Sequence, residues 1–220
     1  MTSSSKRPTC KHCQRPQTNC ICTWIAPVAH SVEILILQHP LEVANAKGSA
    51  RLLHLSLPHS SLVVAETFAE QALQALLAGK NNLLLYPDTP AEPALGIPAA
   101  PAVDPAWLLR PADLRLVVLD GTWRKSRKML YLNPLLQRLP RLVLRNTPPS
   151  HYLIRKAQAE DQLSTLEATC YALMQLEDER PRFQPLMAAF DGFVAQQLRY
   201  ILASTQVRAN ASSGAQLDLS

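Results

Sequence analysis

The sequence has few aromatic residues, little charge and no long apolar run. Aromatic residues make up 5% of the 220-residue chain, which argues against nucleic-acid recognition by a wide stacking surface. No stretch approaches the roughly 18 consecutive apolar residues of a membrane-spanning helix, and the N-terminus lacks the apolar segment of a secretion signal. We therefore expect a cytoplasmic protein. With 47% hydrophobic residues, the chain can bury one substantial core.

Cysteine is scarce outside one short segment. Four of the five cysteines form Cys10-x-x-Cys13 followed by Cys20-x-Cys22, and this clustering excludes a disulfide framework spread over the chain. Four thiolates at this spacing suit tetrahedral structural zinc, with a redox dithiol or unliganded cysteines as alternatives. Cys170 lies in an apolar helical pattern and is expected in the core. We predict a small zinc-binding module over residues 1–26, with the ligands Cys10, Cys13, Cys20 and Cys22.

Acidic residues are absent from two segments that contain many basic ones. Residues 1–32 hold four Lys or Arg, and residues 121–156 hold nine, in a chain with a net charge of +5. Segregation of this kind favours binding of a polyanion such as RNA, although ordinary solvated surface charge is the alternative. The residues expected to contact RNA phosphates are Arg124, Lys125, Arg127, Lys128, Arg145, Arg155 and Lys156.

Apolar runs alternate with helical patterns along the chain. The runs predict buried strands at 32–37, 61–65, 82–86, 114–119 and 141–144. Apolar residues at helical spacing predict helices at 44–55, 67–77, 123–131, 164–179 and 184–202. This alternation is typical of an α/β domain with a mainly parallel sheet flanked by helices, placed here at 27–202.

Two segments are expected to lack regular structure. Residues 87–111 contain seven prolines, which predict a surface loop without a regular helix. The small and polar residues of 203–220 predict a disordered tail.

Asp120 is the first polar residue after the apolar run at 114–119. Ligands of open α/β sheets bind at the carboxyl ends of strands, so Asp120 lies where chemistry is expected. An N-cap for the next helix is an equally good interpretation of an Asp or Thr at this place. The basic residues that follow would hold an anionic substrate near the carboxylate, which makes Asp120 a candidate general base or orienting group. Trp123 is expected to fill the core rather than to stack on a nucleobase.

Two further motifs carry polar side chains. Ser164 and Glu167 form a capping box, and the start of this helix, with the hydroxyls of Ser164 and Thr165, is also suited to bind a ligand carboxylate. His39-Pro40-Leu41-Glu42 follows the first strand. Because a lone His or Glu in a loop is usually solvated, this motif is weak evidence on its own.

In their order along the chain, these motifs resemble the DTW-domain family, which is named for an Asp-x-Thr-Trp motif. The resemblance covers roughly residues 10–200, and the chain looks like the bacterial tRNA-uridine aminocarboxypropyltransferases. One departure is Lys47-Gly48-Ser49-Ala50, where the family often carries Asn-Thr or Asn-Ser. The motifs that carry the resemblance are the four cysteines, His39-Pro40-x-Glu42, Leu85-Tyr86-Pro87, Asp120-Gly121-Thr122-Trp123 and Ser164-Thr165-Leu166-Glu167-Ala168.

The resemblance implies a SPOUT-like α/β fold with a C-terminal trefoil knot and S-adenosylmethionine as co-substrate. It implies transfer of the 3-amino-3-carboxypropyl group to N3 of a uridine in tRNA, with Asp120 as the candidate base. The alternatives are an S-adenosylmethionine-dependent RNA methyltransferase of the same fold and a non-catalytic zinc-containing RNA-binding module. The residues expected to bind the co-substrate are Leu85, Tyr86, Pro87, Leu119, Gly121, Thr122, Trp123, Ser164, Thr165 and Glu167.

Overall fold

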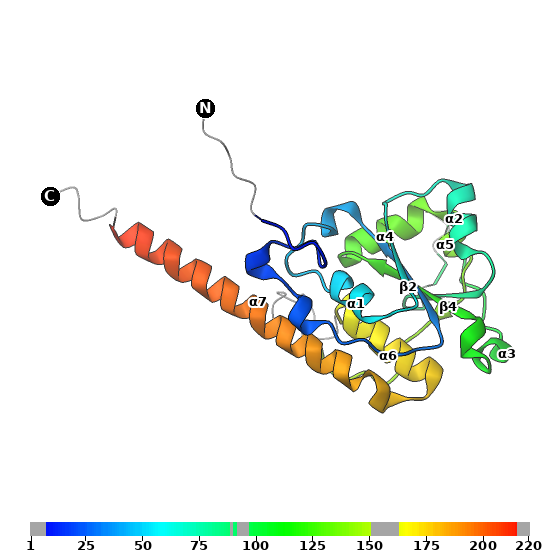
Figure 1. Cartoon of the computed structure of the whole chain (residues 1–220). Helices are drawn as coiled ribbons and strands as arrows, with labels where there is room; N and C mark the ends of the chain where they lie inside the picture. The colour runs from blue at the N-terminus through cyan, green and yellow to red at the C-terminus, as the bar shows by residue number, and fades with distance from the viewer. Residues whose placement is uncertain (1–7, 89, 92–96, 151–162, 215–220) are drawn as a thin grey trace.

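A five-stranded parallel sheet forms the centre of the protein (Figure 1). The computed structural model describes residues 8–88, 90–91, 97–150 and 163–214. The strand order is β2-β1-β4-β3-β5, and every pair of neighbours is parallel. This confirms the α/β class and the parallel sheet expected from the sequence. The strands are β1 (Glu33–Gln38), β2 (Ser60–Val64), β3 (Asn81–Leu85), β4 (Leu114–Asp120) and β5 (Arg141–Leu142).

Helices cover both faces of the sheet. Along β1, Ile34 and Ile36 pack into one apolar cluster with α1 and α6, while Leu35 and Leu37 pack into a second cluster on the opposite face with α2, α4 and α5. Burial on both faces explains why the strand reads as a continuous apolar run. The first layer contains α1 (Ala50–Ser56), α6 (Thr165–Glu177) and α7 (Arg180–Gly214), and the second contains α2 (Glu70–Leu77), α4 (Trp123–Leu132) and α5 (Pro134–Gln137).

The helix expected at 44–55 begins later than the sequence indicated. Pro40–Glu42 forms a 3-10 turn, and α1 starts only at Ala50. Between them, Asn45 accepts from the backbone N–H of Lys47 through its side chain and donates to Glu42. Such local side-chain bonds compete with helix formation, so residues 43–49 form a loop.

Prolines restrict helices less than the sequence suggested. The proline-rich segment contains a one-turn helix, α3 (Pro105–Leu108), in which Pro105 is the first residue and Asp104 is the N-cap. A proline at this position has no helical N–H to lose, so it is compatible with the start of a helix. A second short turn, Pro111–Asp113, also begins with proline.

Helix α7 is longer than expected. It runs from Arg180 to Gly214, through Pro185 and into the segment 203–220 where a disordered tail was expected. No proline follows Pro185 before Gly214 to interrupt the helix. Residues 215–220 lie outside the described residues. Within the described part of the chain, none of the helices combines the length and apolar character of a membrane span.

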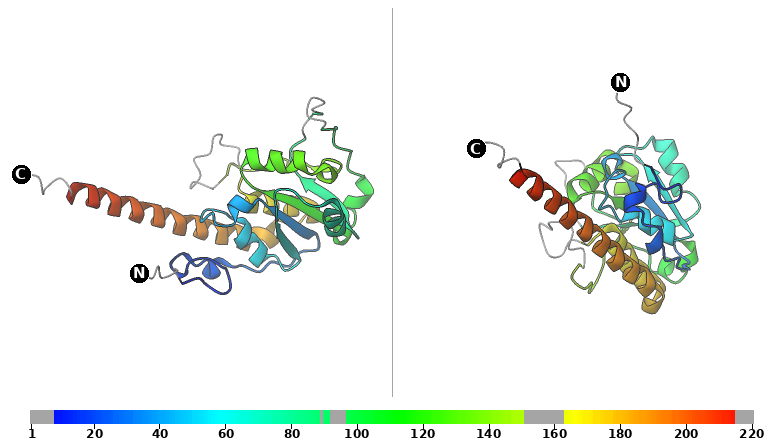
Figure 2. Two further views of the ribbon diagram at one scale, coloured as in Figure 1. Left: turned by 90° about the horizontal axis from the view of Figure 1, so that it is seen from above. Right: turned by 60° about the vertical axis from the view of Figure 1, so that its left-hand side comes forward.

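The N-terminal segment packs along α7, as Figure 2 shows. Its residues Cys13 and Ile21 are fully buried, and the indole of Trp24 lies against Gly192 of α7. The side chain of Gln196 accepts from Nε1 of Trp24 and donates to the carbonyl oxygen of Cys20 at 3.0 Å. The segment is too short to form a core of its own, so it shares the core formed with α7.

The fit of Trp24 against Gly192 generates a stability prediction. A Cβ added at Gly192 would overlap the indole ring. Gly192→Ala should therefore destabilise the protein by about 1–3 kcal/mol through overpacking, although alanine favours a helix by about 1 kcal/mol over glycine. Chemical denaturation measures the change. In a Trp24→Ala background the same substitution should be neutral or stabilising, and equal destabilisation in both backgrounds would contradict this packing.

Candidate active site

A cavity of about 500 Å³ lies where the carboxyl ends of β3, β4 and β5 meet the start of α6. This volume is typical of small-ligand sites. Most residues predicted to bind a co-substrate line it. Leu85, Tyr86 and Pro87 come from the end of β3, Leu119, Gly121 and Trp123 from the end of β4 and its turn, and Ser164 and Thr165 from α6.

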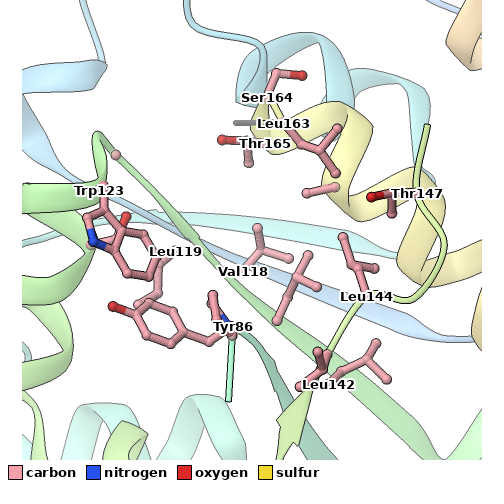
Figure 3. Close-up of a pocket in the computed structure, with 16 residues that line it drawn as sticks. Tyr86, Val118, Leu119, Trp123, Leu142, Leu144, Thr147, Leu163, Ser164 and Thr165 are labelled. Carbon is pink, nitrogen blue, oxygen red and sulfur yellow. The ribbon is translucent and has the colours of Figure 1, made fainter. Parts of the chain in front are cut away.

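The sequence did not identify the wall formed by β5. Leu142, Val143 and Leu144 line the cavity together with Thr147 (Figure 3). This wall could have been predicted, because the run at 141–144 was assigned to a strand and the carboxyl ends of parallel strands share one edge of the sheet. Leu163, next to the capping box, was missed in the same way.

Tyr86 and Trp123 form an aromatic stack beside the cavity. Their ring centroids lie 5.0 Å apart at 18°, and the guanidinium of Arg141 lies 5.6 Å from the centroid of Tyr86 (Figure 3 shows the two rings). Trp123 is 50% exposed, so the expectation that it fills the core was wrong. As the first residue of α4 it projects from the sheet edge, where Tyr86 stacks on it.

The carboxylate of Asp120 is buried and receives two side-chain hydrogen bonds. Gln38 Nε2 donates to Oδ2 at 2.8 Å, and Thr165 Oγ1 donates to Oδ1 at 2.6 Å. Thr122, not Asp120, caps α4 and accepts from the N–H of Lys125. Among the described residues, those lining the cavity include Thr165 but neither Asp120 nor Thr122. Asp120 therefore contacts a cavity-lining hydroxyl and holds it in place.

The predicted capping box of α6 is present. Ser164 Oγ accepts from the N–H of Glu167 at 3.1 Å, and Glu167 Oε2 accepts from the N–H of Ser164 at 2.8 Å. Ser150 Oγ also donates to Glu167. Glu167 is fully buried, and of the described residues it is not one that lines the cavity. Its observed contacts stabilise the start of the helix.

The His39 side chain is buried, contrary to the solvated role expected for it. Nδ1 accepts from the N–H of Leu41 at 3.1 Å, so Nε2 carries the proton and donates to Glu66 at 2.8 Å. Hydrogen bonds from Lys128 and His39 lower the pKa of Glu66. Glu66 was not predicted as a partner of His39, because it lies 27 residues away along the chain and outside the motifs.

Glu42 is buried beside the same loop. Its carboxylate accepts from Asn45 Nδ2 and from Lys125 Nζ, each at 2.7 Å. A buried carboxylate needs such partners, which explains why this residue is not solvated as expected. Lys125, predicted as a phosphate contact, thus pairs within the protein.

The other predicted RNA contacts differ in their surroundings. Arg124, Arg127 and Lys128 are exposed on α4, and Lys128 also pairs with Glu66 at 2.9 Å. Arg145 is exposed after β5. Arg155 and Lys156 lie outside the described residues.

The sulfur atoms of Cys10, Cys13, Cys20 and Cys22 lie within 4.8 Å of one another. Backbone N–H groups of Cys13 and His12 donate to Cys10 and lower its pKa to about 6. Burial and the neighbouring sulfurs raise the pKa of Cys22 to about 12, so a bound cation would help this thiol to ionise. This cluster can bind a metal ion. Cys170 is fully buried in the core, as expected.

The model of the DTW domain matches residues 7–198. The chain belongs to the DTW domain family. It is 29% identical over 209 residues to tRNA-uridine aminocarboxypropyltransferase 2 of Mus musculus and covers 66% of that protein, with 90% of this chain aligned. The Macaca fascicularis protein of the same name is 27% identical, with the same shares covered.

The Drosophila melanogaster tRNA-uridine aminocarboxypropyltransferase 2 is 30% identical over 202 residues, which cover 88% of this chain and 76% of that protein. The chain thus spans about two thirds of the length of its mammalian relatives and three quarters of the fly protein. No solved structure matches this chain.

Proposed function

We propose that this DTW-domain protein transfers the 3-amino-3-carboxypropyl group of S-adenosylmethionine to N3 of a uridine in tRNA. The observation that carries the proposal is the cavity at the strand ends, where the Asp120 turn and the start of α6 meet through the Thr165–Asp120 hydrogen bond. The names of the animal relatives support transfer of an aminocarboxypropyl group to a tRNA uridine. A SPOUT-like fold with a C-terminal knot is part of this proposal.

The cavity suits the co-substrate in size and in the chemistry of its walls. Leu85, Leu119 and Leu142 offer an apolar surface for the methyl group on the sulfonium. Ser164 and Thr165 line the opposite part at the start of the 13-residue helix α6, whose N-terminal dipole favours a carboxylate. When bound, S-adenosylmethionine supplies a sulfonium that activates its neighbouring carbons, and the shape of the cavity would select the aminocarboxypropyl carbon.

Asp120 would act as the base through Thr165. The uridine N3–H proton passes to Thr165 Oγ1 while the hydroxyl proton of Thr165 moves to Asp120 Oδ1, 2.6 Å away. A bond forms between N3 and the aminocarboxypropyl carbon, and the carbon–sulfur bond breaks with its electron pair on sulfur. Methylthioadenosine leaves as a neutral product.

The exposed basic residues of α4 would bind the RNA backbone. Arg124 and Arg127 directly follow the Asp120 turn, and Arg145 is exposed after β5, whose end lines the same cavity. Contacts of this kind position an RNA without reading its sequence. The half-exposed face of Trp123 is available to stack on a base at the mouth of the cavity.

The decisive experiment is mass spectrometry of nucleosides from unmodified tRNA incubated with the protein and S-adenosylmethionine. A uridine heavier by the aminocarboxypropyl group is expected. A methylated uridine would support the methyltransferase instead. Binding of tRNA without any product would support a non-catalytic RNA-binding module.

Substitutions at Asp120 and Thr165 test the proton path. Asp120→Asn should lower kcat about 100-fold or more, and Thr165→Val should do the same, because each removes one step of proton transfer. Thr165→Ser keeps the hydroxyl and should stay near wild type. In Asp120→Asn the side-chain amide of Gln38 can rotate so that its oxygen accepts from the new amide. The melting temperature should therefore change little. A fully active Asp120→Asn variant would exclude Asp120 as the base.

The basic face of α4 can be tested by the salt dependence of tRNA binding. Arg124→Gln and Arg127→Gln should weaken binding of many RNAs alike, and each should reduce the slope of log K against log salt by about 1. Fluorescence anisotropy at several salt concentrations measures this slope. Arg138→Gln is the control, because Arg138 is an exposed arginine of the same basic segment that follows α5 and lies beside Phe68 and Leu73, not on α4 next to the Asp120 turn. An equal loss of slope in the control would place RNA elsewhere.

We also propose that the cysteine cluster binds one zinc ion with a structural role. The four sulfurs match a tetrahedral site without an open position for water. Metal analysis should find one zinc per chain in the purified protein. Cys13→Ser should lower this content, whereas Cys170→Ala, which removes a thiol buried away from the cluster, should not. Zinc retained in full by Cys13→Ser would contradict the ligand set.

A further inference from the structure

We infer that Arg15 is a positioning residue through which the cysteine module fixes loop 39–49 and the start of α6. The effect of Arg15 on catalysis rests on the proposed function, and the effect of metal binding on Arg15 rests on the proposed zinc site.

The backbone of Arg15 belongs to the turn that carries the first two cysteines. Its carbonyl oxygen accepts from the N–H of Cys10 at 2.8 Å, and the N–H of Gln14 donates to the carbonyl of Cys10 at 3.0 Å. Gln14 has a φ of 59°, a left-handed conformation that closes this turn. A metal held by the four sulfurs would hold the turn closed and so fix the position of Arg15.

The guanidinium of Arg15 reaches into loop 39–49. Nη1 donates to the carbonyl oxygen of Ala46 at 2.5 Å, and Nη2 donates to that of Gly48 at 2.6 Å. The side chain is largely buried and lies 5.2 Å from the ring centroid of Phe193 in α7. A planar, two-pronged donor can hold two carbonyls at once, and a lysine cannot reproduce this arrangement.

The loop in turn contacts α6. Ser49, next to Gly48, accepts from the N–H of Leu166 through its Oγ at 3.2 Å. Leu166 lies in the first turn of α6, directly after Thr165, which donates to Asp120. Hydrogen bonds, linked through neighbouring residues of the backbone, therefore connect the cysteine turn to the Thr165 hydroxyl at the cavity.

The same loop is held at its other end by groups of the site. The N–H of His39 donates to the carbonyl oxygen of Asp120 at 2.9 Å, and Glu42 pairs with Lys125 of α4. Among the described residues, the two hydrogen bonds of the Arg15 guanidinium join this loop to the module. Loss of its side chain should therefore loosen residues 45–49 and the first turn of α6 while leaving the four cysteines in place.

Hydrogen exchange on the whole 220-residue chain tests this inference. In the wild type, removal of zinc with a chelator should raise amide exchange at residues 45–49 and 164–167 about tenfold or more. Arg15→Met and Arg15→Lys should show the same rise with zinc still bound, and chelation should then add little there. Lys11→Met removes an exposed positive charge from the same module and should behave as wild type.

Two results would overturn the inference. One is wild-type protection of residues 45–49 in zinc-loaded Arg15→Met. The other is an equal response to chelation in Arg15→Met and wild type. If the protein catalyses the proposed transfer, Arg15→Met should also lower kcat more than it raises KM for tRNA. The exchange measurements need no turnover, so they decide the role of Arg15 even if the proposed reaction fails.

Discussion

The edge of the cavity depends on the hydrogen bonds that the buried carboxylate of Asp120 accepts. An ionised carboxylate removed from water is costly unless hydrogen bonds compensate it. Here Gln38 at the end of β1 and Thr165 at the start of α6 supply them. Two segments that lie 82 and 45 residues away along the chain must therefore meet at the end of β4.

The strands and the place of the cavity could be predicted because their signals are local. A run of apolar residues such as 114–119 indicates a strand that is buried on both faces, and the first polar residue after the run marks the end of the strand. The surroundings of Trp123, His39 and Glu42 were predicted wrongly because they depend on distant partners. Tyr86, Glu66 and Lys125 reach these side chains from other elements of the fold.

The cysteine cluster shows the same division between local and distant information. The spacing of Cys10, Cys13, Cys20 and Cys22 predicted that their sulfurs could meet, and they do. The spacing carries no information about the surface that covers the module. The contacts of Trp24 with α7 and of Arg15 with loop 39–49 became visible only in three dimensions. The basic residues of this N-terminal segment were expected to favour RNA binding, yet Arg15 uses its charge inside the protein.

The packing of the N-terminal module on α7 also sets an order of assembly during synthesis. The four cysteines leave the ribosome early and are close enough along the chain to bind a metal ion at once. Their packing partners, Gly192, Phe193 and Gln196, are made some 170 residues later. Since domains form as the chain emerges, the cysteine module can dock only after α7 has been made, and a nascent chain that ends before α7 leaves Trp24 without its partner Gly192.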